Sequence, residues 1–157
     1  MKTAGIIGGI GPPSTIEYYR QIIDLYRARK PDGSYPPLII NSIDLNRMRT
    51  WIEANLLSNA AEYLLSEIRK LADAKADFAV LAANTPHLVF DTLSRRSPIP
   101  LISIVEVTLQ AAKASGMKRL ARRGPMAWSA TPVHSSTINS TTFCQPDGCS
   151  FIWRVTT

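Results

Sequence analysis

The sequence predicts an α/β fold, in which a parallel sheet of about four strands carries helices on both faces. Two observations predict it. Short β-branched runs alternate with longer helical patterns over residues 3–118, which is the order expected of βαβ units. The run over residues 77–83 is apolar from Phe78 onward, as expected of a strand buried on both faces. Right-handed crossovers between such strands give a sheet of the flavodoxin-like type.

The first elements follow from residues 3–42. Residues 3–8 predict a short buried strand that ends in glycine. The prolines at positions 12 and 13 can start a helix, with Ser14 as its N-terminal cap. That helix continues through apolar residues that recur at helical spacing, namely Ile16, Tyr19, Ile23 and Tyr26. Residues 38–42 then predict the second strand.

The later elements continue the alternation. A long helix is predicted by one apolar face, made of Leu57, Ala60, Leu64, Ile68 and Leu71. After it the sequence predicts a strand over residues 77–83, a short helix over 86–93, a strand over 100–105 and a helix over 107–114.

The alternation stops near Leu120. Of the twelve acidic residues, only Asp147 lies beyond this point, and Ser and Thr become frequent without either period. Arg122 and Arg123 fall where a buried strand would run, and Pro125 would interrupt its hydrogen bonds. We therefore expect an α/β lobe over residues 1–118. Over residues 119–157 we expect an aberrant, poorly structured tail that is translated from a shifted reading frame.

Composition argues against several classes of function. The net charge is +6, but Lys and Arg are scattered, mostly at the ends of predicted helices, and are not interleaved with aromatic residues. Nucleic acid is therefore not an expected partner. No apolar run approaches the ~20 residues of a membrane helix, and the glycine-rich start is unlike a signal peptide, so we expect a cytoplasmic protein. Cys144 and Cys149 have no partners for a metal cluster and no context for a disulfide framework.

Ligands of a parallel sheet bind beyond the carboxyl ends of its strands, and glycines follow the first strand there. Gly8, Gly9 and Gly11 let the backbone approach an anion, and the helix that follows offers N–H groups. A tight turn between strand and helix explains these glycines about as well. The dinucleotide-binding fingerprint is not met, because Ser14 occupies its third glycine position.

Two further segments are expected at the same edge. The amide of Asn84 and the hydroxyl of Thr85 would suit a carboxylate, although both residues are equally explained as caps of the next helix. The other segment follows the second strand and consists of residues 41–44 (Asn-Ser-Ile-Asp) with Arg47. Arg47 could pair with a carboxylate through two hydrogen bonds, although an ordinary solvated arginine is the favoured alternative. A lone histidine such as His87 is more often structural than a proton donor.

At these segments the sequence resembles the aspartate/glutamate racemase family. The opening GIIGGIGPPSTIEYY resembles the family's Gly-Gly-Met-Gly-Pro turn and its Ser/Thr-rich helix start. DFAVLAANTPHLVFD is similar to the second signature, an apolar strand that leads into Cys-Asn-Thr-x-His. PIPLISIVEVT and GMKRL resemble the segments that follow, and the four matches are collinear over roughly the first 120 residues.

The resemblance implies one of two pseudo-symmetric lobes, with the site in the cleft between them. Neither pyridoxal phosphate nor a metal is implied. Two cysteines, one from each lobe, would exchange a proton on opposite faces of the substrate α-carbon. The first cysteine position here is Ala83, and the Gly-Cys-Thr-type motif of the second lobe is absent, so no catalytic cysteine is intact.

The residues that match the family's motifs by position are ligand-binding ones. The resemblance implies a turn at Gly8, Gly9 and Gly11, a ligand carboxylate at Asn84 and Thr85, and His87 as an auxiliary residue. We expect a truncated racemase-family protein without activity, whose ligand is a small amino acid or dicarboxylate. A non-catalytic carboxylate-binding or protein-interaction module is the alternative, and a nucleotide-binding domain ranks third. Whether the chain forms a homodimer stays open. Whether Ala83 marks a natural branch of the family that lacks the cysteine and has another activity also stays open.

Overall fold

The computed structural model describes residues 1–114, 119–124, 138–145 and 148–155. The chain divides into two compact units, Met1–Val105 and Glu106–Thr157. The first unit contains a four-stranded parallel sheet of order β2-β1-β3-β4. Its strands are β1 (Ala4–Gly8), β2 (Leu38–Ser42), β3 (Phe78–Leu81) and β4 (Leu101–Ile102). The predicted α/β fold with a four-stranded parallel sheet is therefore confirmed.

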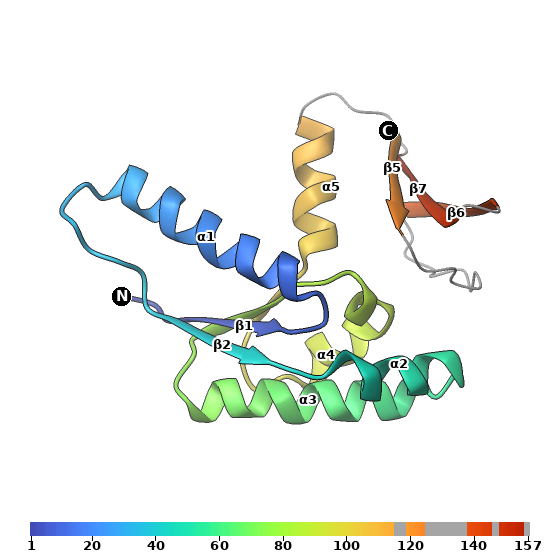
Figure 1. Cartoon of the computed structure of the whole chain (residues 1–157), viewed down its shortest axis with the longest axis horizontal. Coiled ribbons are helices and arrows are strands. Elements are labelled where there is room, and N and C mark those ends of the chain that lie inside the picture. The colour runs from blue at the N-terminus through green and yellow to red at the C-terminus, as the bar shows by residue number, and fades with distance from the viewer. Residues whose placement is uncertain (115–118, 125–137, 146–147, 156–157) are drawn as a thin grey trace. The chain divides into compact units, whose positions relative to one another are not determined.

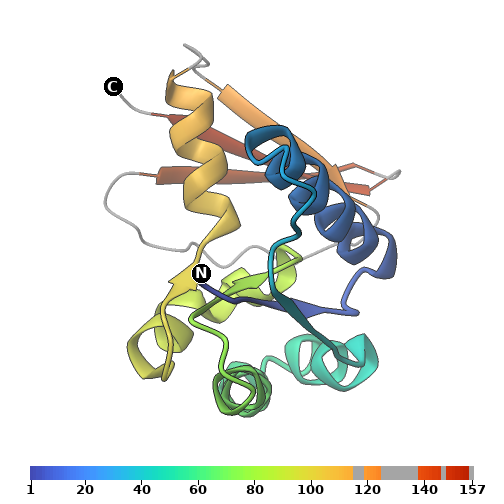
Figure 2. The same cartoon turned by 90° about the vertical axis from the view of Figure 1, so that its left-hand side faces the viewer.

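Helices cover both faces of this sheet. They are α1 (Pro12–Arg29), α2 (Leu45–Glu53), α3 (Leu57–Asp73), the 3₁₀ helix η1 (Thr85–Val89) and α4 (Phe90–Arg96), and α5 (Ile104–Ala114) follows them in the chain. Figures 1 and 2 show α1 on one face of the sheet and α3 on the other. The apolar face predicted for α3 is confirmed, because Leu64, Ile68 and Leu71 are fully buried against the sheet. Each such side chain contributes about 1.5–3 kcal/mol relative to its exposed state.

The register of the strands brings three loops to one edge of the sheet. Gly8 aligns with Ser42 across β1 and β2, and Ile7 aligns with Leu81 across β1 and β3. The chain also pairs just beyond the strands, where the Ile43 N–H donates to the Gly8 carbonyl at 2.9 Å. The segments that follow β1, β2 and β3 therefore begin side by side, as the topology predicted.

Helix α1 differs from its prediction in two respects. It begins at Pro12 with Gly11 as the N-cap, so Ser14 lies inside the first turn and does not cap it. Proline favours the first helical positions because its φ is fixed and its missing N–H is not needed there. The buried residue of α1 is Thr15, whereas Ile16 and Tyr19 are 68% and 48% exposed. The helical spacing was correct, but in this structure the predicted apolar stripe is only partly covered.

Helix α2 was not predicted. One long helix was expected after the second strand, and the structure has two, separated at Asn55, whose φ is 56°. Asparagine tolerates this left-handed conformation better than most residues. Asp44 caps α2 by accepting the Asn46 N–H at 2.8 Å. The strand predicted over 77–83 and the one over 100–105 are both shorter, and the helix predicted over 86–93 divides into η1 and α4.

The second unit contains a separate antiparallel sheet of order β5-β7-β6. Its strands are β5 (Arg119–Gly124), β6 (Ile138–Gln145) and β7 (Gly148–Val155). Residues 125–137, which hold the predicted interruption at Pro125, lie outside the described residues. A shifted reading frame as the origin of residues 119–157 stays a prediction. Within the described part of the chain, no helix combines the length and the apolar character needed to cross a bilayer.

Candidate ligand-binding site

The turn after β1 requires glycine at two positions. Gly9 has a φ of +83°, and a Cβ built on it would lie 2.3 Å from the carbonyl oxygen of Ile43. A Cβ on Gly8 would lie 2.4 Å from the Thr15 γ-methyl. Gly11 differs, since its φ is −136° and its nearest neighbour would be the Ser14 hydroxyl at 3.4 Å. Backbone geometry and close packing therefore explain Gly8 and Gly9 but place no such demand on Gly11.

The hydrogen bonds of this turn decide which donors a ligand could use. The Gly9 N–H donates to the Thr15 Oγ1 at 3.0 Å, so it is directed into the protein. The first two residues of α1 are prolines, which have no N–H, so the start of the helix offers fewer donors than the sequence suggested. Among the residues that the structure describes, the N–H groups of Ile10 and Gly11 make no hydrogen bond.

The segment after β3 starts beside this turn. Its backbone is joined to β1 where the Ala82 N–H donates to the Ile7 carbonyl at 2.9 Å. Asn84 is exposed and Thr85 is half-buried. The Asn84 side chain does not cap η1, and within the described ranges neither side chain makes a hydrogen bond. The capping alternative thus has no support at Asn84, and both polar side chains are available to a ligand.

His87 is held as a neutral ring. Its Nδ1 lies 3.0 Å from the Ala83 carbonyl oxygen, which can only accept, so Nδ1 carries the proton. The ring stacks on Phe90 with centroids 5.0 Å apart. Burial lowers the pKa of His87, although the carbonyls of Ala83 and Asn84 oppose the shift. Its Nε2 is buried and has no partner among the described residues, so this histidine is better suited to fixing the backbone at Ala83 than to carrying protons.

Arg47 belongs to a different cluster. Its guanidinium lies over the rings of Trp51 and Tyr63, 5.9 Å and 5.3 Å from their centroids. The two rings meet edge to face at 5.6 Å. These contacts are cation–π interactions. In the part of the chain that the structure describes, no hydrogen bond or ion pair joins Arg47 to residues 8–11 or 83–85, and its guanidinium contacts these aromatic rings instead.

A buried carboxylate ties β2 to α3 close to this edge. Glu67 is 6% exposed and accepts the Asn41 amide at 2.8 Å and the Lys70 ammonium at 2.8 Å. Burial opposes its ionisation, but the hydrogen bonds from Lys70 and Asn41 outweigh that effect and hold the pKa of Glu67 below its usual value. The hydrogen bonds from the Asn41 amide therefore anchor the end of β2 to α3, whereas the ion pair with Lys70 lies within α3.

Two residues next to the turn were not among the site residues predicted from the sequence. Thr15 is 8% exposed, and its hydroxyl donates to the Gly11 carbonyl at 3.2 Å while it accepts from Gly9. Ser42 ends β2, and its hydroxyl oxygen lies 2.7 Å from where a Gly9 Cβ would be. The sequence signal for Thr15 was its place four residues after Gly11, since threonine hydroxyls in helices often bond the carbonyl four residues back.

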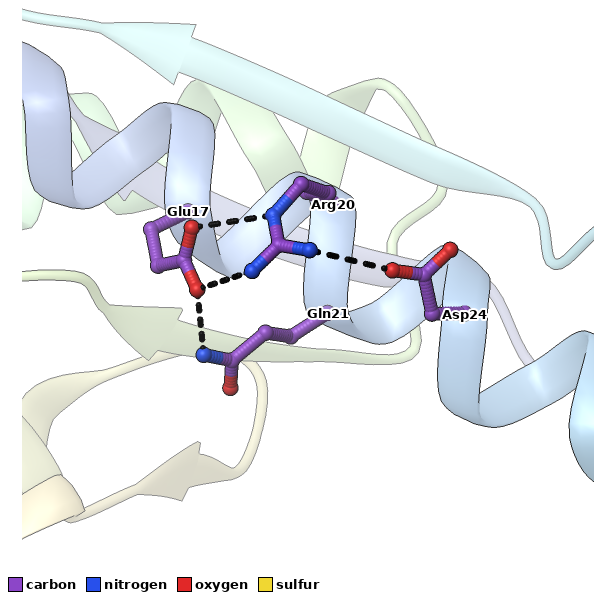
Figure 3. A network of polar contacts seen from close by, with 4 residues as sticks. All are labelled: Glu17, Arg20, Gln21 and Asp24. Carbon is purple, nitrogen blue, oxygen red and sulfur yellow. Dashed lines mark hydrogen bonds and ion pairs between the residues drawn. The ribbon is translucent and has the colours of Figure 1, made fainter.

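Two other polar features do not belong to this site. On α1, Glu17 accepts hydrogen bonds from Arg20 and Gln21, and Arg20 also reaches Asp24 (Figure 3). The bonds from Arg20, and then from Gln21, lower the pKa of Glu17 to about 2. The network is exposed, so it contributes little to stability.

The second feature is a hollow of about 290 Å³. It is lined by residues of α3, η1 and α4, and two of them, Glu62 and Arg96, form an ion pair. Its lining includes neither the glycine turn nor Asn84 and Thr85. The hollow is therefore distinct from the candidate site.

Comparison with known proteins gives consistent matches. Residues 7–143 match the family model for Asp/Glu/Hydantoin racemase. The chain is similar to the broad specificity amino-acid racemase of Bacillus subtilis (strain 168), with 28% identity over 120 residues, which are 68% of this chain and 47% of that protein.

Two solved structures are similar as well. An aspartate racemase homologue from Pyrococcus horikoshii OT3 is 35% identical, has a TM-score of 0.68, and aligns over 75% of this chain and 51% of its own. The aspartate racemase of Picrophilus torridus, 23% identical with a TM-score of 0.60 over 74% of this chain and 49% of its own, shows the likeness of fold alone. The chain thus spans about half the length of the relatives that it matches.

Proposed function

Since the chain belongs to the Asp/Glu/Hydantoin racemase family, we propose that its parallel-sheet lobe binds the carboxylate of a small amino acid or dicarboxylate. The site is the edge of the sheet where the loops after β1 and β3 begin. The supporting observation is a group of donors without partners among the described residues, namely the N–H groups of Ile10 and Gly11 and the side chains of Asn84 and Thr85. Backbone N–H groups in concave turns, together with side-chain amides and hydroxyls, are typical carboxylate ligands.

We also propose that residues 1–157 do not racemise this ligand. The resemblance implies a cofactor-independent reaction in which two cysteines transfer protons at the α-carbon. At the first of these positions the chain has Ala83, and a methyl group has no proton to transfer. His87 is a poor replacement, because its one proton is bonded to the Ala83 carbonyl and its Nε2 is buried. Binding without turnover is the function that these residues support best.

Titration with L-aspartate tests the binding site. We expect weak binding, with a Kd on the order of millimolar, because a ligand held by two loops of one sheet edge stays largely hydrated. Amide chemical shifts should move at Ile10, Gly11, Asn84 and Thr85. Asn84→Ala should raise the Kd about tenfold or more, since it removes one hydrogen bond to a charged group.

Two control variants sharpen this titration. Asn59→Ala changes an exposed asparagine on α3 and should leave the Kd unchanged. Arg47→Ala should do the same, because its guanidinium is engaged by Trp51 and Tyr63. If shifts appear only far from the two loops, or if Arg47→Ala weakens binding more than Asn84→Ala does, the proposed site is wrong.

A further inference from the structure

The glycine turn is fastened to α1 by one side chain. The Thr15 hydroxyl accepts the Gly9 N–H at 3.0 Å and donates to the Gly11 carbonyl at 3.2 Å. The Thr15 N–H donates to that same carbonyl at 3.0 Å. One residue thus bonds to both sides of Ile10 and closes the turn around it.

Thr15 also fits the turn through its methyl group. It is the buried residue of α1, at 8% exposure, and its γ-methyl occupies the space beside Gly8 that a side chain there would need. On the opposite side, Gly9 lies against the backbone of Ile43. The turn is therefore held from α1 on one side and from the end of β2 on the other.

We propose that Thr15 is a positioning residue of the ligand site. Its hydroxyl fixes the backbone conformation of residues 8–11, and through it the placement of the Ile10 and Gly11 N–H groups. This consequence for a ligand rests on the proposed function, whereas the link between Thr15 and the turn does not. A threonine meets the requirement because a hydroxyl in this place satisfies the Gly9 N–H, while the β-branched shape fills the space beside Gly8.

The test compares variants that separate the hydroxyl from the shape. Thr15→Val keeps the shape and removes the hydroxyl, and Thr15→Ser keeps the hydroxyl. Two measurements are made on the full chain, the hydrogen-exchange rate of the Gly9 amide and the Kd for L-aspartate. Thr15→Val should raise the Gly9 exchange rate about tenfold, which corresponds to the loss of one hydrogen bond. It should also raise the Kd several-fold, while Thr15→Ser stays within about twofold of the original chain in both.

Exchange at Ile6 and Leu81, in the buried strands β1 and β3, serves as the internal reference. If the variant merely loses global stability, the exchange rates of the Ile6 and Leu81 amides should rise as much as that of Gly9. That result would overturn the proposal. If Thr15→Val does not fold, Thr15→Ala and Thr15→Ser replace it as the pair, since they differ by the hydroxyl alone.

The remaining outcomes separate this proposal from the proposed function. Unchanged Gly9 exchange in the variants without a hydroxyl overturns the role of Thr15. Faster Gly9 exchange with an unchanged Kd also overturns its positioning role. If the original chain binds no aspartate and Gly9 exchange still rises selectively, the proposed function fails while the link between Thr15 and the turn is supported.

Discussion

Replacing Gly9 by alanine is expected to lower the free energy of unfolding of the first unit by about 3 kcal/mol or more. Two costs combine at this position. A residue with a side chain loses about 1–2 kcal/mol in the left-handed conformation that Gly9 adopts at a φ of +83°. The new Cβ would also lie 2.3 Å from the carbonyl oxygen and 2.6 Å from the nitrogen of Ile43. Overpacking of this kind adds about 1–3 kcal/mol.

The clash at Gly9 cannot be relieved by rotating a side chain. The atoms that it meets are backbone, and the Ile43 N–H is itself bonded to the Gly8 carbonyl at 2.9 Å. Moving Ile43 away would therefore break the pairing just beyond β1 and β2. The loss of stability should be accompanied by loss of aspartate binding, because Ile10 and Gly11 follow directly in the chain.

Gly33 provides a matched control for this experiment. Its φ is +80°, nearly the same as that of Gly9, but a Cβ there would meet no atom within 4 Å. Gly33→Ala should therefore cost only the conformational part, about 1 kcal/mol. Urea unfolding, followed through amide signals of the first unit, measures the free energy of unfolding of both variants. The two values are compared at the same dependence of that free energy on urea concentration. If Gly9→Ala and Gly33→Ala lower the free energy of unfolding equally, Gly9 does not approach the backbone of Ile43 as closely as described.

The sequence alone predicted where the glycine turn lies but not where the Arg47 side chain lies. The meeting of the loops after β1 and β3 followed from topology, since parallel strands end at one edge. The direction of Arg47 did not, because its aromatic partners Trp51 and Tyr63 belong to two different helices, one of which was not predicted. Such contacts depend on the angle between helices, which the spacing of residues within one helix does not encode.

The donors of the turn were misjudged for a related reason. Glycines before a helix suggested open N–H groups, yet the Gly9 N–H is satisfied by Thr15, and prolines occupy the first two helical positions. The absence of N–H groups at these two positions follows from the sequence, because proline has no backbone N–H. The bond to Thr15 could be suspected only from its spacing to Gly11, because the burial of its hydroxyl depends on the helix lying against the sheet.

Incubation of the 157-residue chain with L-aspartate in deuterium oxide is expected to give no D-aspartate above the level in buffer. The α-proton beside a carboxylate is very weakly acidic, so its transfer needs a base on one face and an acid on the other. At the position of the first family cysteine, Ala83 provides neither. The measurement is the α-proton signal of aspartate over time, together with chiral analysis of the product.

Ala83→Cys should leave the yield of D-aspartate at the level in buffer. The introduced thiol would stand on one face of the α-carbon, and the transfer needs a second group on the other face. Even as a thiolate it could remove a proton and return it only on the same face, which exchanges deuterium but preserves the configuration. Because Ala83 is half-buried, the accessibility of the new thiol needs a control. Labelling of the variant with an alkylating reagent provides it. Production of D-aspartate in proportion to protein concentration, by either form, would show that a second acid serves the opposite face and that the chain is a working racemase.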